Sequence, residues 1–261
     1  MFNLTSIYKP LTANGRDPIK HLPCAALRPF IADYWGTEDV LDAAEQTPGL
    51  VIPDTCRDVI FEVNHATDAG HCWHCGMDEA AYFSSLTPQT NSCFAIRFYC
   101  WSTHFFDDCH NWLPFFTNML LSTHTIHERI AKTEQFLLKK LDASRSNDNV
   151  MNALYHILKH HGNAKVPDIC GYASVSQRQL ERLFSTHIGT TMKKTANLVR
   201  YQNLWRDVAN LQRFDVLDAV DKYGYTDQSH LLRSFAKYHY GMTPAQARRD
   251  VVFLQDKTES L

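Results

Sequence analysis

The sequence lacks any hydrophobic run long enough to cross a membrane, since no apolar stretch approaches the ~20 residues that a spanning helix needs. Its first ten residues also lack the basic and then apolar layout of a secretory signal peptide. We therefore expect a cytoplasmic chain with no membrane partner. Its eight cysteines are expected to remain thiols, because that compartment is reducing.

The usual signatures of catalysis and nucleotide binding are missing as well. The chain contains no Gly-x-Ser-x-Gly nucleophile elbow, no phosphate-binding loop and no Gly-x-Gly-x-x-Gly turn. Its composition is ordinary for a globular protein, with 44% hydrophobic and 21% charged residues. A chain of 261 residues is long enough for two domains. We expect a two-domain protein with no enzymatic activity and no cofactor.

The two parts of the chain carry opposite charge, although the whole has a net charge of only −2. Residues 1–150 hold 11 Lys and Arg against 18 Asp and Glu, whereas residues 151–250 hold 14 against 8. A basic region next to an acidic one suggests that only the C-terminal part meets a polyanion.

The N-terminal part is rich in predicted strands and the C-terminal part in predicted helices. Val59 to Val63 and Phe94 to Tyr99 are runs of β-branched and aromatic residues bounded by turn formers. His127 to Leu141 has the apolar spacing of an amphipathic helix, and another helix is expected from Val150 to His161. We predict an α+β protein with a strand-rich regulatory or dimerisation domain at 1–143, a structureless linker at 144–149, an all-helical domain at 150–250 and a tail at 251–261.

The helical part contains an internal repeat. Leu180-Glu181-Arg182-Leu183-Phe184 returns as Leu231-Leu232-Arg233-Ser234-Phe235, displaced by 51 residues, and a glycine follows each copy. A short helix and a tight turn precede each copy, with helices expected at Val166 to Tyr172 and Val216 to Tyr223. A repeat of this kind indicates a duplicated supersecondary unit. A long helix from Met192 to Leu211 would connect the two copies.

Each copy has the layout of a helix that reads DNA. Ser176 and Asp227 are suited to cap the two repeated helices, and Gly224 to end the helix before the second turn. Polar side chains near the start of each helix face away from its apolar side, where a recognition helix contacts base edges in the major groove. The alternative is that these are ordinary surface residues of a helical bundle, and about half of them are expected to touch no base. The predicted DNA-binding residues are Gln177, Arg178, Glu181, Arg182, Gln228, Ser229, His230 and Arg233.

From Val166 to Arg249 the sequence resembles the AraC/XylS family of transcription regulators. The resemblance lies in Ser176-x-Arg178-x-Leu180-x-Arg182-x-Phe184, Gly189, Arg200-Tyr201-Gln202, the run from Gly224 to Leu231, and Gly241-Met242-Thr243-Pro244. It implies two helix-turn-helix subdomains in successive major grooves on one face of DNA. Two positions depart from the family pattern, since Ser174 replaces a glycine of the first turn and Val220 an alanine of the second supporting helix.

The N-terminal part is similar to one branch of that family, in which the front domain is thought to sense a signal or mediate pairing. The resembling stretches are Arg28 to Trp35, Pro53 to Phe61 and Ile96 to Phe98, with Thr55 in place of the family's glycine. We expect most aromatic residues of this part to fill a core. A few of them, with Arg57 or Arg97 to orient a ligand, could form a small-molecule pocket.

One local cluster suggests a different function. His71, Cys72, His74 and Cys75 lie within five residues, so they could bind a soft transition metal or form a redox pair. The alternative is a hairpin between strands that packs Trp73 and carries incidental thiols, because no second Cys-x-x-Cys or His-x-x-x-His follows at zinc-finger spacing. A metal or redox sensor acting through Cys72 and Cys75 is therefore the second hypothesis.

The first hypothesis is a one-component, sequence-specific DNA-binding transcription regulator, controlled through its N-terminal domain. The expected partner is double-stranded DNA. A small-molecule effector, RNA polymerase and a second copy of the chain, in a homodimer, are further candidate partners.

Overall fold

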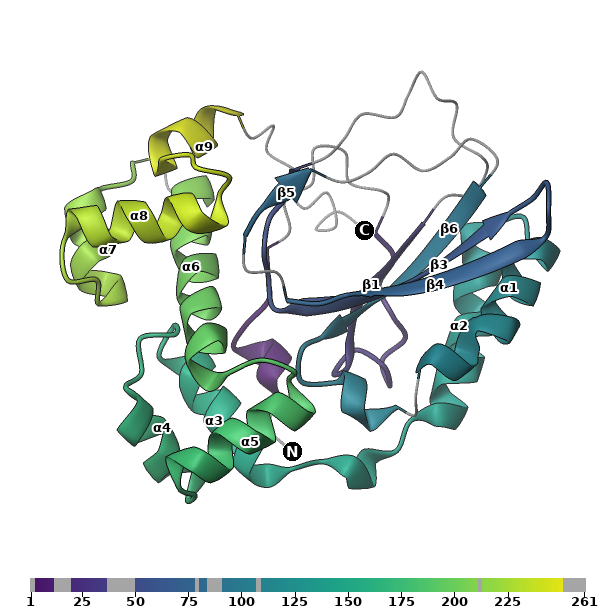
Figure 1. The fold of residues 1–261 in the computed structure, drawn as a ribbon, viewed down its shortest axis with the longest axis horizontal. Helices are drawn as coiled ribbons and strands as arrows, with labels where there is room; N and C mark the ends of the chain where they lie inside the picture. The colour runs from purple at the N-terminus through teal and green to yellow at the C-terminus, as the bar shows by residue number, and fades with distance from the viewer. Residues whose placement is uncertain are drawn as a thin grey trace.

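The computed structural model describes residues 3–11, 20–36, 50–77, 80–83, 91–106, 109–210 and 213–250. An N-terminal antiparallel sheet with its helices lies beside a wholly helical C-terminal region, and the long axis of the molecule runs through both (Figure 1). The predicted α+β class is therefore confirmed. Within the described residues, no helix combines the length and apolar character that a membrane crossing requires.

Four strands form the main sheet: β1 (Ile31–Gly36), β3 (Cys56–Asn64), β4 (Ala69–Cys75) and β6 (Asn91–Tyr99). They lie in the order β1-β6-β3-β4, and all neighbours are antiparallel. The two predicted strands are confirmed as the centre of this sheet, where Val59 pairs with Ile96 and Phe61 with Phe94. A second, two-stranded sheet pairs β2 (Leu50–Val51) with β5 (Tyr82–Phe83).

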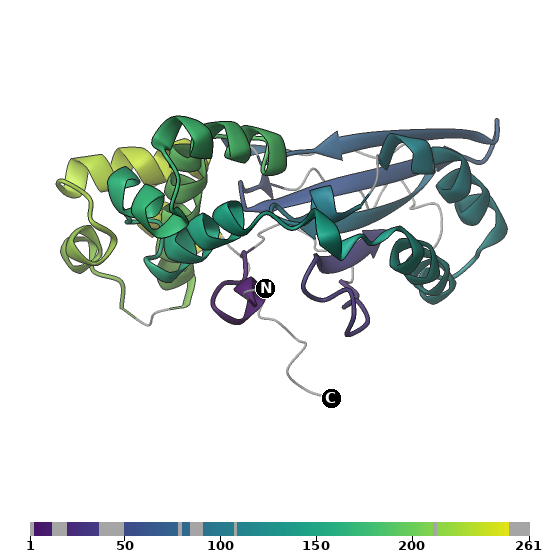
Figure 2. The same ribbon diagram turned by 90° about the horizontal axis from the view of Figure 1, so that it is seen from below.

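Two helices, α1 (Leu113–Ser122) and α2 (Ile126–Lys140), complete the N-terminal domain. The helix α1 packs on β3 and β4, where the Phe61 ring stacks on that of Phe116 with 3.8 Å between ring centroids. The predicted amphipathic helix is α2, whose Thr125 cap accepts a hydrogen bond from the Glu128 backbone N–H at 3.3 Å. Figure 2 shows α1 and α2 at the end of the sheet farthest from the helical region.

The connection between the two regions is more ordered than the expected linker. A 3-10 turn, η5 (Ala143–Arg145), follows α2, and the Asp142 carboxylate accepts a hydrogen bond from the Ser144 backbone N–H at 3.0 Å. The next helix, α3 (Asp148–Lys159), begins two residues before the predicted start, because Asn147 caps it through the Val150 N–H at 3.1 Å. The polar residues that suggested a structureless segment thus act as capping residues.

The helical region continues with α4 (Val166–Ala173), α5 (Gln177–His187), α6 (Met192–Asn210), α7 (Val216–Tyr223), α8 (Gln228–Tyr238) and α9 (Pro244–Asp250). The four helices predicted for the repeat and the long connecting helix are confirmed within one residue at the ends that the structure describes. We refer to α4 and α5 as the first unit, and to α7 and α8 as the second unit.

The two regions meet through shared hydrophobic clusters. Leu4 and Tyr8 from the N-terminal segment, with Cys56 of β3 and Trp101 just after β6, pack with α3 and the first unit in one buried cluster. Ile52 similarly joins the cluster that surrounds the second unit. The N-terminal domain therefore contacts both units.

Candidate nucleic-acid interface

The first unit is held by apolar residues on the inner sides of its two helices. Ile169 of α4, with Leu180 and Phe184 of α5, is at most 1% exposed. The turn between the helices passes through Ser174, which adopts the left-handed conformation with φ +56°. Ser176 then caps α5, because its hydroxyl accepts a hydrogen bond from the Gln179 backbone N–H at 3.3 Å. The family preference for glycine at position 174 has this conformation as its physical reason.

The second unit repeats this construction. Leu231 and Phe235 of α8 are fully buried, as are their counterparts in α5. Gly224 ends α7 in the left-handed conformation with φ +63°, and Asp227 caps α8 through the His230 backbone N–H at 2.7 Å. The predicted roles of Asp227 and Gly224 are confirmed. Both units are thus complete helix-turn-helix motifs, in which the second helix carries the polar outer face.

Most of the predicted DNA-binding side chains are exposed at the beginnings of α5 and α8. In α5 the exposed ones are Gln177, Arg178 and Arg182, and in α8 they are Gln228, Ser229 and Arg233. The matching positions in the two helices carry arginines, Arg182 and Arg233, which can pair with guanine. The structure therefore gives each unit an accessible polar face that begins at the positive end of its helix.

Glu181 and His230 differ from the other six because both are half-buried. The His230 ring folds back on the turn before α8, where its Nδ1 accepts a hydrogen bond from the Thr226 backbone N–H at 3.4 Å. It also meets the Tyr225 ring edge to face, with 5.3 Å between centroids. The His230 side chain thus supports the turn in this arrangement instead of extending from the surface.

The helix α6 sets the separation of the two units. It has 19 residues, which corresponds to a length of about 28 Å, and the units lie at its opposite ends (Figure 1). One helical turn of DNA separates successive major grooves by roughly 34 Å. The spacing of the units therefore suits two neighbouring grooves.

Arg200 of α6 joins the end of α3 to the turn of the second unit. Its guanidinium donates to the Gly162 carbonyl at 3.3 Å and lies over the Tyr225 ring at 5.3 Å. Gly162 has φ +78°, and any Cβ there would overlap the backbone of α6 at Ala196 and Arg200. This glycine allows the end of α3 to touch α6, so the relative position of the units is fixed from within the helical region.

Two further residues of α6 attach the N-terminal domain to it. The Gln202 side chain donates to the Pro53 carbonyl and accepts from the Leu11 backbone N–H, both at 2.7 Å. The Arg206 guanidinium donates to the Lys9 carbonyl and lies over the Tyr8 ring at 5.9 Å. Arg206 is therefore a bridge between regions and not a solvated cation.

The N-terminal domain also contacts the C-terminal end of α5, the second helix of the first unit. Arg57 of β3 donates a hydrogen bond to the Ile188 carbonyl, and its guanidinium fills the space where a side chain at residue 189 would lie. Sequence reasoning did not find this contact, because Arg57 and Ile188 lie 131 positions apart.

Next to Arg57, His104 of η3 (Thr103–Phe105) meets His187 edge to face, with 4.9 Å between ring centroids. Burial, with smaller effects of His187 and Arg145, lowers the pKa of His104 to about 4, so this contact joins two neutral rings at neutral pH.

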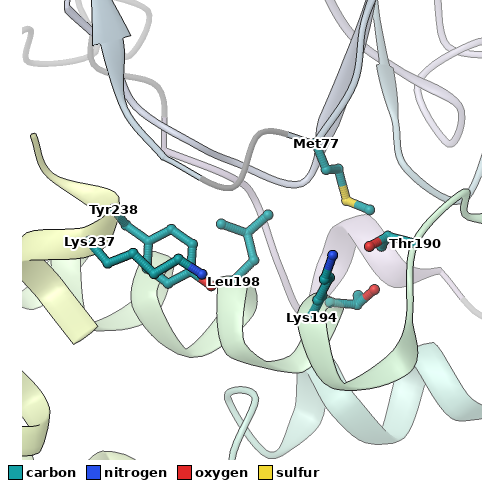
Figure 3. Close-up of a pocket in the computed structure, with 7 residues that line it drawn as sticks. Met77, Thr190, Lys194, Leu198, Lys237 and Tyr238 are labelled. Carbon is teal, nitrogen blue, oxygen red and sulfur yellow. The ribbon is translucent and has the colours of Figure 1, made fainter. Parts of the chain in front are cut away.

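The residues expected to line an effector pocket in the N-terminal domain have other partners in the structure. Arg97 is 8% exposed and pairs with Asp54 and with Asp58 Oδ2, the latter at 3.2 Å. Arg57 is occupied by the helical region. Six of the aromatic residues considered for a pocket are instead buried in the cores, namely Phe30, Tyr34, Phe61, Phe98, Tyr99 and Trp101. A cavity does exist, but it lies where the N-terminal domain meets the helical region (Figure 3).

The cluster of histidines and cysteines lies within the strand β4 and not in a hairpin turn. Alternation along a strand places His71 and Cys75 on one face, and Cys72 and His74 on the other. Burial also raises the pKa of the Cys72 thiol to about 11, which disfavours the thiolate that binds metals. Across the part of the chain that the structure describes, no three His, Cys, Asp or Glu side chains come together as metal ligands.

Comparison with known families agrees with this geometry. Residues 169–250 match a family model described as a helix-turn-helix domain, and these residues contain α5 to α9 and most of α4. The C-terminal region is an AraC-type helix-turn-helix domain. A helix-turn-helix domain binds DNA, so this region is the DNA-binding part of the chain.

The remaining comparisons describe the N-terminal region and the fold. Residues 19–108 match a family described as a domain of unknown function (DUF6597). No curated protein matches the sequence significantly. One similar structure is a transcriptional regulator with an AraC-type DNA-binding domain from Chromobacterium violaceum, with 22% identity over 39% of this chain and 89% of that one, at a TM-score of 0.35.

Two structures of ToxT from Vibrio cholerae are also similar. One has 10% identity over 94% of this chain and 99% of that one, at a TM-score of 0.39. The other, described as bound to an unsaturated fatty acid, has 10% identity over 94% and 98%, at a TM-score of 0.37. The assignment of the helix-turn-helix domain rests on the family model and on the two units described above.

Proposed function

We propose that the protein is a DNA-binding transcription regulator of the AraC/XylS type and a one-component switch, in which residues 150–250 read DNA and residues 1–143 control them by docking on both units. The proposed DNA contacts are the six exposed side chains at the beginnings of α5 and α8, together with the half-buried Glu181 and His230. The observation that carries the proposal is the duplicated recognition helix, with a polar, exposed N-terminal face in each copy.

Control through the N-terminal domain is supported by its contacts with the helical region. Arg57 and His104 touch the end of α5, and Pro53 is bonded to α6. A small-molecule effector can shift the regulator only if it binds one arrangement of these parts better than another. RNA polymerase and a second copy of the chain are the further partners that we propose.

The test is an electrophoretic mobility shift with the full-length protein, on a DNA site selected from random sequence. Arg182→Ala and Arg233→Ala should each weaken binding by about 1–3 kcal/mol, because each removes a bidentate contact with a base. Binding should also fall steeply with salt, since phosphate contacts release counterions.

Arg28→Ala is the matched control, because Arg28 is an exposed arginine of the N-terminal domain that bonds the Pro23 carbonyl. It should leave the affinity unchanged. If neither recognition-helix variant, nor the double variant, binds DNA more weakly than the control, these arginines do not read DNA and the proposal fails.

A further inference from the structure

One buried guanidinium of the N-terminal sheet faces three carboxylates and binds two of them. Strand pairing places Arg97 of β6 between Asp33 of β1 and Asp58 of β3, so all three side chains lie on one face of the sheet. Asp54 comes just before β3. Arg97 forms ion pairs with Asp54 and Asp58, and none is formed with Asp33. The group therefore holds more negative than positive charge in a place with little access to water.

Asp33 is the carboxylate without a donor. It is 8% exposed, and its Oδ1 has no hydrogen-bond partner among the residues that the structure describes. The two oxygens of Asp54, in contrast, bind Arg97 and a backbone N–H. Those of Asp58 bind Arg97 and the Trp35 indole, both at 3.2 Å. A buried carboxylate oxygen that has lost its hydration without gaining a donor favours the protonated, neutral acid.

The surroundings of Asp33 bring its charge change close to neutral pH. In the described part of the chain, four charged side chains act on it, namely Arg97 of β6, Asp58 of β3, Asp54 before β3 and Lys20 before β1. Burial is the main cause that raises the pKa of Asp33 to about 6, while the two cations oppose this shift and the two carboxylates add to it. Burial also raises the pKa of Asp58, and it keeps the nearby Cys56 thiol neutral by raising its pKa well above the ordinary range.

The carboxylate group adjoins the segment through which the N-terminal domain holds the helical region. We call residues 53–57 the docking segment, whose first carbonyl accepts a hydrogen bond from α6 and whose Arg57 donates one to the end of α5. Asp54 lies between these two contacts and ties the segment to the sheet through Arg97. An ionised Asp33 repels Asp54 and competes with it for the guanidinium, whereas a protonated Asp33 does neither.

We propose that Asp33 is a proton sensor, in which uptake of one proton by its carboxylate, as the pH falls below neutral, strengthens the docking of the N-terminal domain on the helical region. The proton comes from solvent, and no other group changes. The proposal rests on the docking that the proposed function includes, but its test needs no DNA. A chain that docks in this way and reads no DNA would refute the proposed function and leave the sensor standing.

The direction of the effect follows from linkage between docking and proton binding. The buried cluster shared by the two regions contains Cys56 and Tyr99, which lie two positions from Asp58 and Arg97, so undocking would admit water to this group. Asp33 in water has the ordinary pKa of 3.8 and binds a proton less readily than in the docked protein. The resulting gain in docking is complete below pH 3.8 and is lost as the pH rises through 6.

The test compares hydrogen exchange in the full-length protein and in Asp33→Asn at pH 7.5 and 5, without DNA. Asparagine keeps the shape of the side chain but stays uncharged, so it imitates the protonated state at both values. Backbone amides of residues 186–191, at the end of α5, report docking. Dividing the exchange rate of the unmodified protein by that of the variant removes the intrinsic effect of pH and the effect of the histidines, which both proteins share. This ratio should fall about tenfold from pH 7.5 to 5.

Asp68→Asn is the matched control. Asp68 is an exposed carboxylate in the turn between β3 and β4, where its φ of +54° is a conformation that asparagine adopts readily. Its ratio should be the same at both pH values. Asp33→Ser, a smaller neutral replacement, serves as the second variant if the amide cannot be accommodated. A ratio that does not change with pH, an equal change in the Asp68 variant, or a change confined to amides of the sheet would overturn the proposal.

Carbon-13 NMR of the aspartate carboxyl groups reads the proton itself, independently of docking. The unmodified protein should contain one carboxyl resonance that titrates near pH 6 and is absent from Asp33→Asn or Asp33→Ser. If every aspartate titrates below pH 5, or if the resonance persists in these variants, Asp33 does not take up the proton and the proposal fails.

Discussion

The two helix-turn-helix units share one construction but are attached to the rest of the protein differently. In each, a glycine in the left-handed conformation follows the recognition helix, with φ +75° at Gly189 and +79° at Gly241. Arg57 of the N-terminal domain fills the space beside Gly189, whereas among the described residues no atom beyond its chain neighbours lies within 4 Å of the position where a Cβ on Gly241 would be. The glycine that follows the recognition helix is thus contacted by the N-terminal domain in the first unit, whereas the space beside it stays open in the second unit.

The second unit touches the N-terminal domain through apolar contacts, which include the buried Ile52 and a more exposed pair of rings. Phe83 meets Tyr240 edge to face, with 5.0 Å between centroids, but these side chains remain 50% and 54% exposed. The first unit instead makes a directed hydrogen bond and a contact between two half-buried rings. A directional hydrogen bond weakens steeply when its geometry changes. A conformational change in the N-terminal domain should therefore affect the environment of α5 more than that of α8.

Arg57→Met should have the largest effect on the difference in attachment between the two units. The change keeps the aliphatic volume but leaves the Ile188 carbonyl without its donor, which should weaken docking by about 1–3 kcal/mol. Hydrogen exchange in the full-length protein should show backbone amides of residues 186–191 exchanging roughly fivefold to 150-fold faster. Arg28→Met is the control. Equal acceleration around Gly241 would show that the two units are not attached differently.

Lowering the pH should weaken the two units through different histidines, each with a pKa of about 4. Burial is the main cause for both His104, which contacts the first unit, and His239, which lies inside the second unit with its Nδ1 2.8 Å from the Tyr201 hydroxyl. Because the pKa of each is below the ordinary 6.5, its contribution to stability is complete above pH 6.5. That contribution is lost as the pH falls towards 4.

The two effects can be separated by His104→Gln. Protection factors, corrected for the intrinsic effect of pH on exchange, should fall for the end of α5 and for α8 between pH 7 and 4.5 in the unmodified protein. In the variant the fall at α5 should be reduced, while that at α8 remains. An unchanged pH response at α5 would remove His104 from the docking contact.

The smallest expected effect concerns the turns inside the units. Ser174 and Gly224 hold the same left-handed conformation, which costs a residue with a Cβ roughly 1–2 kcal/mol. Ser174→Gly should therefore raise the free energy of unfolding by about 1 kcal/mol, whereas Gly224→Ala should lower it by a similar amount or more, because its Cβ would meet the Asn163 side chain. Denaturant unfolding measures both. Destabilisation by Ser174→Gly would show that the serine hydroxyl matters more than the backbone conformation.

The helical region could be predicted closely from sequence because its signals are local. Apolar residues three and four apart defined the buried faces, and Ser176, Gly224 and Asp227 marked the helix ends. The central strands were equally clear, and Cys56, Cys93 and Cys100 are buried small side chains as expected. The side chain of Cys109 lies outside the described residues, as does the tail from residue 251.

What could not be predicted depends on contacts between distant parts of the chain. Arg200 and Arg206 look like solvated cations in a helix pattern, but their partners are Gly162, Tyr225, Lys9 and Tyr8. The strand position of His71 to Cys75 was missed because the cluster has no clear alternation of apolar and polar residues. A pocket was expected among aromatic residues of the N-terminal domain, but six of these pack in the cores, and the cavity described here lies where the two regions meet.

The most direct measurement of the central claim is a hydroxyl-radical footprint of the full-length protein on its selected DNA site. Two units separated by the length of α6 should protect two segments on one face of the duplex, about one helical turn apart. Arg182→Ala should weaken protection of one segment, and Arg233→Ala protection of the other. A single protected segment, or loss of the same segment in both variants, would contradict the claim that the two recognition helices occupy successive major grooves.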